Sequence, residues 1–584
     1  AGSVQHRPHH LAAPPSLRTC ASLLVRGSGK MGMRAGLLEH WLACVGLLLA
    51  EGPLCAAGHA DAYGTRTEHV WIKSWDAASL SGDARVPAAR SQNELFPVVI
   101  FANSWACSEM EYIMETIKLA ELGYLVLEYA TRGWWPSSGT IQAAGRKDQL
   151  DTSAVIDYVL SRKDWQPDPN KIALAGISYG AGLALLGAAH DPRVTTALAM
   201  SGWPSIESAL FHNGSPNLIW GEVLVVSGEL LGHLDPSVPA MWKQVLHGNE
   251  SGFHDWAAER SVETFMGAFE ERPVPLFLSS NMEDRLFSPE DMFNFFERYP
   301  GPKKLLLNQG IHATAEIGGL ADLPWNHIWN EAIEWLNHYL KGTAGLQLDV
   351  LVDVQLRSDK SVREKFYEWP SKRIASLDFE MGPRGVLGLH GSLLPPAASA
   401  RAETGGRLVN ESISFSRKSG FNAGFPIIGE ALQVFVDSRI ASNLLFASKQ
   451  HAIWYYTPLA RKTRICGTPV LSLDFTPSAS TWQLVAYLWA VNWADEGTLI
   501  SHGTVSCWNC TAGERITREI QLRTLCEDVS GGLGLGLDLF SELYQPANTD
   551  GNLKMTFHYS TAFGLKVPEV LIGSDTSSEF AIVV

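Results

Sequence analysis

The chain has 584 residues, 46% of them hydrophobic and 18% charged, and its formal net charge at pH 7 is −15. This length exceeds what one hydrophobic core supports, so we expect two domains, and the ordinary composition argues against a largely disordered chain. The negative charge argues against nucleic acid as a partner, because that binding depends on Lys and Arg side chains that neutralise phosphates.

Residues 1–62 are predicted to be an upstream segment followed by a secretory signal peptide. Arg34 precedes an apolar stretch from Leu37 to Leu49, and small residues with Ala60-Asp61-Ala62 follow it. This order of charge, apolar run and A-x-A-like site is typical of a signal peptide. The alternative is a short membrane anchor, but the stretch is shorter than the about 20 residues that span a bilayer. We therefore expect a secreted or extracytoplasmic protein without stable membrane insertion.

From Glu68 to Gly342, strand-like and helix-like patterns alternate. Helical stretches separate most of the apolar runs typical of buried parallel strands, which lie at 97–102, 124–128, 171–175, 274–278 and 304–307. The alternation predicts a doubly wound parallel sheet for a catalytic domain over 63–345. A segment at about 203–262 interrupts it and is predicted to be a helical cap.

The remainder of the chain, 346–584, has the pattern of an all-β domain. Short strands separated by turn residues are predicted at 348–356, 431–436, 470–475 and 482–490. Regular short strands without helices point to a β-sandwich or jelly roll.

Four cysteines cluster in this second domain: Cys466, Cys507, Cys510 and Cys526. In a secreted protein they predict two disulfides, although the sequence leaves the three possible pairings open. Zinc is the less favoured alternative, because a second cysteine pair with metal-ligand spacing is missing. We expect no metal and no cofactor.

A nucleophile motif lies directly after the predicted strand 171–175. Gly176-Ile-Ser178-Tyr-Gly180 precedes a helical stretch of small residues, which is the context that a G-x-S-x-G elbow requires. The glycines are expected because side chains there would collide with the neighbouring elements. The motif predicts an α/β-hydrolase fold with Ser178 as the nucleophile.

Such a fold places an acid and a histidine later in the chain, each after a strand. Asp284 follows the strand 274–278, and His312 follows the strand 304–307. His312 would accept the proton of Ser178, and Asp284 would hold the imidazole in the required tautomer. The alternatives are Glu283 for the acid and His327 for the base.

Two backbone N–H groups are predicted to stabilise the oxyanion of an acyl-transfer reaction. One belongs to Tyr179, directly after the nucleophile, and the other to the loop after the strand 97–102, where we favour Trp105. Cys107 lies close by without an elbow around it and is interpreted as structural. Arg132 is interpreted as an ion-pairing residue for Asp148 or Asp151.

Several segments, in this order, resemble the cocaine esterase and Xaa-Pro dipeptidyl-peptidase family of serine hydrolases. They are Tyr129–Gly133 with Ser138-Gly139, the elbow, Trp256–Ser261 and Trp335–Gly342, and Asp284 and His312 fall where the family's acid and base fall. The resemblance covers about residues 66–584 and implies a catalytic domain with a cap, followed by a jelly roll. Cocaine-esterase-like members use a tyrosine hydroxyl as an oxyanion donor, whereas 103–105 contains no tyrosine, so backbone donation is expected here.

The combined pattern predicts a serine hydrolase that cleaves an ester or amide of a small molecule or peptide through an acyl-enzyme on Ser178. One alternative is an Xaa-Pro-type dipeptidyl-peptidase, which needs an anchor for the free amine of its substrate. Glu109, Glu111 and Glu222 are candidates for that anchor. A second alternative is a non-catalytic secreted carbohydrate-binding protein.

Overall fold

The fold is taken from a computed structural model. It describes residues 62–320, 326–343, 349–384, 390–396, 410–415, 441–443, 453–492, 494, 496–539, 552–559 and 563–571. The predicted upstream segment and signal peptide lie outside these residues except for Ala62, and so does the predicted strand 431–436. Within the described residues, no helix combines the length and the apolarity needed to cross a bilayer.

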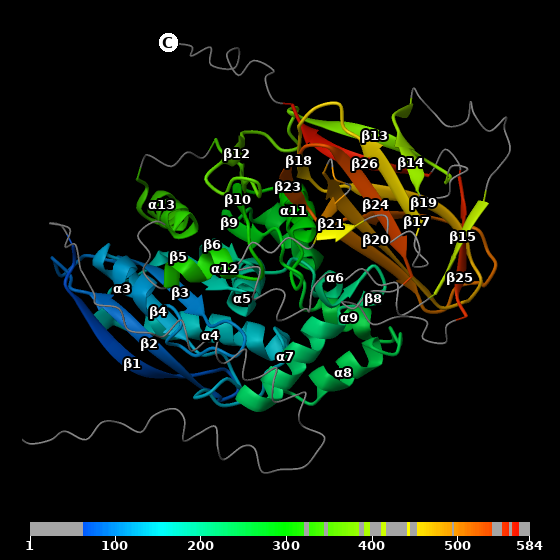
Figure 1. The fold of residues 1–584 in the computed structure, drawn as a ribbon. Helices are drawn as coiled ribbons and strands as arrows, with labels where there is room; N and C mark the ends of the chain where they lie inside the picture. Colours follow the sequence, from blue (N-terminus) through cyan, green and yellow to red (C-terminus); the bar gives the residue numbers. More distant parts are fainter. Residues whose placement is uncertain are drawn as a thin grey trace, which may run out of the picture. The chain divides into compact units, whose positions relative to one another are not determined.

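Among the described residues, the first sheet has ten strands in the order β1-β2-β4-β3-β5-β6-β9-β10-β11-β12 (Figure 1). The strands from β4 to β11 in this order pair in parallel, and antiparallel strands close both edges. The strands are β1 (Thr65–Lys73), β2 (Ser79–Pro87), β3 (Phe96–Ala102), β4 (Leu125–Tyr129), β5 (Pro167–Ile177), β6 (Val194–Met200), β9 (Leu276–Asn281), β10 (Lys303–Asn308), β11 (Val352–Gln355) and β12 (Arg363–Phe366). The predicted doubly wound sheet is thus present.

Helices cover both faces of this sheet. They are α3 (Ile113–Glu121), α4 (Arg146–Ser161), α5 (Tyr179–His190), α10 (Met266–Glu271), α11 (Pro289–Arg298), α12 (Thr314–Leu320) and α13 (His327–Lys341). Alternate residues of β3 belong to two hydrophobic cores, one on each face of the sheet. Val98 and Ile100 pack with α4 and α5, whereas Val99 and Phe101 pack with α3 and α13. A continuously apolar strand such as β3 is buried on both faces for this reason.

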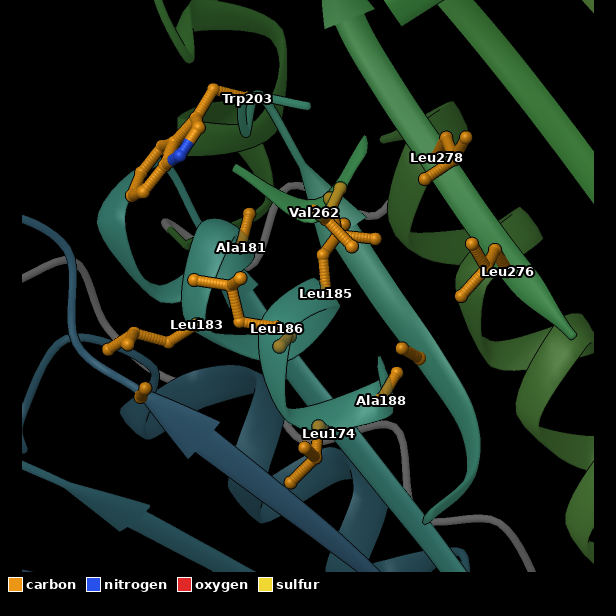
Figure 2. Packing of buried hydrophobic residues seen from close by; sticks show 14 of the residues in the cluster. Leu174, Ala181, Leu183, Leu185, Leu186, Ala188, Trp203, Val262, Leu276 and Leu278 are labelled. Atoms are coloured by element: carbon orange, nitrogen blue, oxygen red, sulfur yellow. The ribbon is translucent and has the colours of Figure 1, made fainter. Parts of the chain in front are cut away.

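Helix α5 lies very close to its neighbours because its sequence is rich in small residues. A Cβ atom on Gly182 would lie 2.3 Å from the Trp203 ring, and one on Gly187 would lie 2.4 Å from Leu174 Cδ1. Figure 2 shows Leu174 and Trp203 beside this helix, together with its own leucines. The close approach fixes the start of α5, where the nucleophile motif lies.

The segment between β6 and β9 contains the helices predicted for the cap. They are α6 (Ile206–Leu210), α7 (Leu218–Leu231), α8 (Ser237–Val245) and α9 (Phe253–Ala258), with a short hairpin of β7 (Phe211–His212) and β8 (Ser215–Pro216) between the first two. A single helical turn, Val262–Phe265, leads on to α10.

The first sheet continues beyond the boundary predicted at residue 345. Strand β11 pairs in parallel with β10, and β12 pairs with β11, so the sheet ends at Phe366. The prediction was wrong in assigning 348–356 to the β domain. Val352 and Val354 are fully buried in the first sheet, and their alternation with polar residues is the same pattern that a strand of the second domain shows.

The second sheet is largely antiparallel and has 14 strands in the part of the chain that the structure describes; β14 and β17 pair in parallel. The strands are β13 (Ile374–Gly382), β14 (Gly391–Leu394), β15 (Asn410–Ser414), β16 (Ala441–Asn443), β17 (Ile453–Pro458), β18 (Thr463–Gly467), β19 (Val470–Pro477), β20 (Trp482–Val491), β21 (Glu496–Cys507), β22 (Ile516–Gln521), β23 (Leu525–Val529), β24 (Gly532–Asp538), β25 (Lys554–His558) and β26 (Gly564–Val570). This domain has a core cluster of its own.

Both predicted disulfides are present in the β domain. Cys466 pairs with Cys526 across β18 and β23, and Cys507 pairs with Cys510 after β21. Between the latter two, Trp508 donates its indole N–H to the carbonyl of Gly214 in the cap, at 2.7 Å. The second disulfide therefore closes the loop that carries this contact between the β domain and the cap.

Candidate active site

Ser178 lies on the turn between β5 and α5. Its φ of 54° is a left-handed conformation that is strained for a residue with a side chain. A Cβ atom on Gly176 would lie 2.4 Å from the backbone of Gly180, and one on Gly180 would lie 2.1 Å from the carbonyl oxygen of Ala102. Glycine is therefore required on both sides of the serine, as the motif predicted.

The structure brings the three predicted triad residues together. His312 Nε2 lies 2.8 Å from Ser178 Oγ, and His312 Nδ1 lies 2.8 Å from Asp284 Oδ2. Since the carboxylate accepts at Nδ1, the neutral ring carries its proton there, which leaves Nε2 to accept the hydroxyl proton. The geometry is that of a serine activated by a general base.

Asp284 is held in place by the loop that carries it. It is 1% exposed, and its Oδ1 accepts the backbone N–H groups of Leu286 at 2.8 Å and Phe287 at 3.0 Å. Its Oδ2 therefore remains directed at His312. The carboxylate thus accepts from three donors and is placed to stabilise the imidazolium that forms when His312 takes up a proton.

The alternative acid and base point elsewhere. Glu283 Oε1 lies 3.3 Å from Arg357 Nε, and His327 Nε2 lies 3.1 Å from Asp353 Oδ2, at the start of α13. Arg132 makes the predicted ion pair with Asp151, which accepts its Nε and Nη2 protons, both at 2.6 Å.

The two residues predicted as oxyanion donors both line the pocket at Ser178. Tyr179 is the first residue of α5, and the N–H of a first helical residue has no carbonyl one turn earlier to bind. Trp105 lines the same pocket as Ser178 and Tyr179. Its indole Nε1–H donates to Ser227 Oγ at 3.1 Å, so the side-chain N–H of Trp105 is engaged with α7.

A pocket opens at Ser178, and its walls are almost entirely apolar. We call it the serine pocket: α7, α8, α9 and the loop after Asp284 contribute Leu224, Val225, Met241, Trp242, Phe253 and Phe287. Within the described residues, no Asp, Glu, Lys or Arg side chain lines it. Apolar walls favour an apolar group on the ligand, because burial removes that group from water.

A second pocket lies behind the loop that carries Asp284. We call it the arginine pocket: it is lined by residues 282–285 and 499–502 together with Arg357 and Arg523. Arg523 donates to Glu290 at 2.8 Å, and burial raises the pKa of that carboxyl group to about 7. Burial beside Arg523 and Arg285 lowers the pKa of His502 well below its usual value.

The cap residues that line the serine pocket and the residues that line the arginine pocket could not be predicted from the sequence. The apolar residues of the cap helices have the same pattern as core residues, and the arginine pocket draws on segments that lie far apart in the chain. Within the described residues, no group of three or more His, Cys, Asp and Glu side chains is arranged to hold a metal ion.

Residues 76–314 match the family model of X-Pro dipeptidyl-peptidase (S15 family). The match covers the nucleophile, the acid and the histidine, and it confirms the resemblance read from the motifs. Among curated proteins, no sequence matches the chain significantly.

Several solved structures share the fold over most of the chain. A CocE/NonD family hydrolase from Staphylococcus aureus has a TM-score of 0.65 at 13% identity, covering 87% of this chain and 94% of that chain. An aminopeptidase from a Thaumarchaeota archaeon has a TM-score of 0.64 at 12% identity, covering 89% and 99%. An α-amino acid ester hydrolase has a TM-score of 0.62 at 12% identity, covering 89% and 98%. The fold is therefore an α/β-hydrolase domain followed by a largely antiparallel β domain.

Proposed function

We propose that the protein is a serine hydrolase that cleaves an ester or amide through an acyl-enzyme on Ser178. The observation that carries the proposal is the continuous chain of hydrogen bonds from Ser178 through His312 to Asp284, with 2.8 Å at each step. Ser178 lies on a strained elbow and lines a pocket, which is where acyl-transfer chemistry needs a nucleophile.

The chemistry follows from these positions. Ser178 Oγ attacks the carbonyl carbon of the substrate while His312 Nε2 takes up its proton. The resulting oxyanion is stabilised by the N–H groups of Tyr179 and Trp105. When the intermediate collapses, His312 returns the proton to the leaving alcohol or amine. Water then attacks the acyl-enzyme with His312 as the base, which releases the acid and restores Ser178.

The serine pocket supports a substrate with an uncharged, apolar acyl group. Its lining residues offer no carboxylate to bind an ammonium group. Of the three anchor candidates, Glu111 contacts Ser104, Glu109 contacts Ser81, and the exposed Glu222 accepts from the indole of Trp242. A bound free amine would be desolvated there without a partner, which is costly. The family description nevertheless makes an Xaa-Pro dipeptidyl-peptidase the second candidate.

Turnover of p-nitrophenyl esters with acyl chains of two to eight carbons, compared with Xaa-Pro p-nitroanilides, tests this proposal. We expect ester hydrolysis with kcat/KM rising with chain length, and a loss of at least about 10³-fold in Ser178→Ala. Hydrolysis of the Xaa-Pro amides in preference to the esters would favour the dipeptidyl-peptidase. No turnover of either series by the folded protein would support the carbohydrate-binding alternative, and retention on a glycan column would then test it.

We also propose that the protein is secreted. The two disulfides of the β domain support this, because such bonds persist in oxidising compartments. N-terminal sequencing of protein recovered from the culture medium is expected to find a start near Ala60. Recovery only from cell membranes, with residues 37–49 retained, would support the anchor instead.

A further inference from the structure

The loop after β3, residues 103–107, is held in one orientation by hydrogen bonds to its own backbone. The carbonyl oxygen of Ser104 accepts the side-chain N–H of Asn103 at 2.8 Å and the backbone N–H of Cys107 at 3.1 Å. Both donors belong to the loop, so this carbonyl points into the loop. Asn103 is itself fixed, because its Oδ1 accepts the backbone N–H of Thr131 at 2.8 Å.

The orientation of this carbonyl determines that of the next N–H group. A trans peptide is planar, and its N–H points opposite to its C=O. Among the described residues, the cis peptide bonds are those before Pro136 and Pro370, so the bond between Ser104 and Trp105 is trans. The N–H of Trp105 is therefore directed out of the loop, and Trp105 lines the serine pocket together with Ser178.

Glu111 holds Ser104, the residue whose carbonyl begins that peptide, through two other atoms of the same residue. Its Oε2 accepts the backbone N–H of Ser104 at 2.6 Å, and its Oε1 lies 2.6 Å from Ser104 Oγ. That hydroxyl also lies 3.0 Å from the carbonyl oxygen of Ile177, the residue before the nucleophile. The Glu111 carboxylate therefore holds two atoms of Ser104, and the Ser104 hydroxyl contacts the strand that ends in the elbow.

We propose that Glu111 is a positioning residue for the oxyanion site: it holds Ser104 so that the N–H of Trp105 stays directed at the developing oxyanion. The proposal rests on the serine hydrolase function proposed above. It does not need Glu111 to touch the substrate, and Glu111 does not line the serine pocket. Loss of the contacts between Glu111 and Ser104 would let the loop reorient. This would weaken one of the two oxyanion donors, while the pocket that binds the acyl group stays in place.

The proposed positioning role does not require a negative charge on Glu111, and this distinguishes it from roles that depend on the charge of a carboxylate. Burial raises the pKa of Glu111 to about 7, so both of its protonation states are accessible near neutral pH. A glutamine at this position can still accept the N–H of Ser104 through Oε1 and donate to Ser104 Oγ through its amide. A leucine of similar volume can do neither.

The test compares Glu111→Gln and Glu111→Leu with a matched control, Glu109→Leu. Glu109 is a neighbouring buried carboxylate that accepts from Ser81 Oγ at 2.8 Å and not from the loop 103–107. For a p-nitrophenyl ester, we expect Glu111→Leu to lower kcat about 10- to 100-fold with KM changed less than about twofold, because one oxyanion donor contributes about 10²–10³-fold. We expect Glu111→Gln to retain at least about a third of kcat, and Glu109→Leu to behave as the wild type.

A boronic acid inhibitor, which forms a tetrahedral adduct on serine, gives a second readout. Its inhibition constant should rise in Glu111→Leu by about the same factor as kcat falls. If Glu111→Leu does not fold, judged by its near-ultraviolet circular dichroism, Ser104→Ala replaces it, with a kcat loss of at least about threefold expected. Unchanged kcat in the folded variants, or an equal loss in Glu111→Gln and Glu111→Leu, would overturn the inference. A wild-type protein that neither turns over esters nor binds the inhibitor would overturn the proposed function and the inference together.

Discussion

The serine pocket and the arginine pocket share one short loop, but the residues that line them differ in charge. Leu286 and Phe287 face the serine pocket, which has no charged walls, whereas Glu283 and Arg285 face the arginine pocket. Asp284 also lines the arginine pocket and directs one oxygen at His312. The loop therefore keeps the charges of the domain junction away from the substrate side while it supplies the one carboxylate that the triad needs.

The largest expected effect is on kcat, and it distinguishes Asp284 from Glu283, the two carboxylates of this loop. Asp284→Asn should lower kcat about 10³- to 10⁴-fold, because the amide no longer accepts from His312 Nδ1 and favours the wrong tautomer. Glu283→Gln is the matched control: its side chain contacts Arg357, so kcat should stay within about threefold. Steady-state kinetics on one ester checks both, and equal losses would contradict the assignment of Asp284.

A charge introduced into the serine pocket should have the next largest effect. Val225 lines the pocket on α7, whereas Val223 on the same helix does not. Val225→Asp should lower kcat/KM for an octanoyl ester about 10- to 100-fold, because the carboxylate disfavours the apolar chain. It should lower the value much less for an amino acid ester with a free amine. Val223→Asp should leave both values within about threefold; equal effects of the two variants would show that the acyl chain does not bind in this pocket.

The smallest expected effect concerns stability at the domain junction. Burial, together with the charge of Arg523, lowers the pKa of His212 to about 3. In the unfolded chain its pKa is about 6.5, so between those values the unfolded state binds a proton that the folded state does not. His212 therefore lowers the unfolding free energy as the pH falls below about 6.5, by at most about 1.4 kcal/mol per pH unit.

The comparison of wild type with His212→Gln isolates this contribution from that of the buried carboxylates. The melting temperature of the variant relative to that of the wild type should rise steadily from pH 7 to pH 5, because glutamine does not titrate. A difference that stays constant over this range would show that His212 is not a buried neutral histidine. Thermal unfolding in buffers of equal ionic strength measures it.

The sequence was most informative where the backbone itself constrains the residue type. Gly176 and Gly180 are required by contacts of 2.4 Å and 2.1 Å, so the elbow was readable as a motif. Asp284 and His312 were readable because the ends of parallel strands converge at one edge of a sheet. The doubly wound parallel sheet was predicted from the regular alternation of strand-like and helix-like patterns.

The sequence was least informative where contacts join distant segments. Strand β11 could not be assigned to its sheet, because alternation shows burial and not the partner strand. The arginine pocket joins residues 282–285 to Arg357, His502 and Arg523, which no periodicity links. Glu111 was predicted only as a candidate anchor for a substrate amine, and its two contacts with Ser104 are visible only in the structure.

The most direct test of the central claim is labelling with a fluorophosphonate, followed by mass spectrometry of the tryptic peptides. The reagent reacts with a serine whose hydroxyl is activated by a base, and so reports on the triad without any choice of substrate. We predict one phosphonyl group on the peptide that contains Ser178, and none in Ser178→Ala. A folded wild-type protein that stays unlabelled, or is labelled at another serine, would contradict the account.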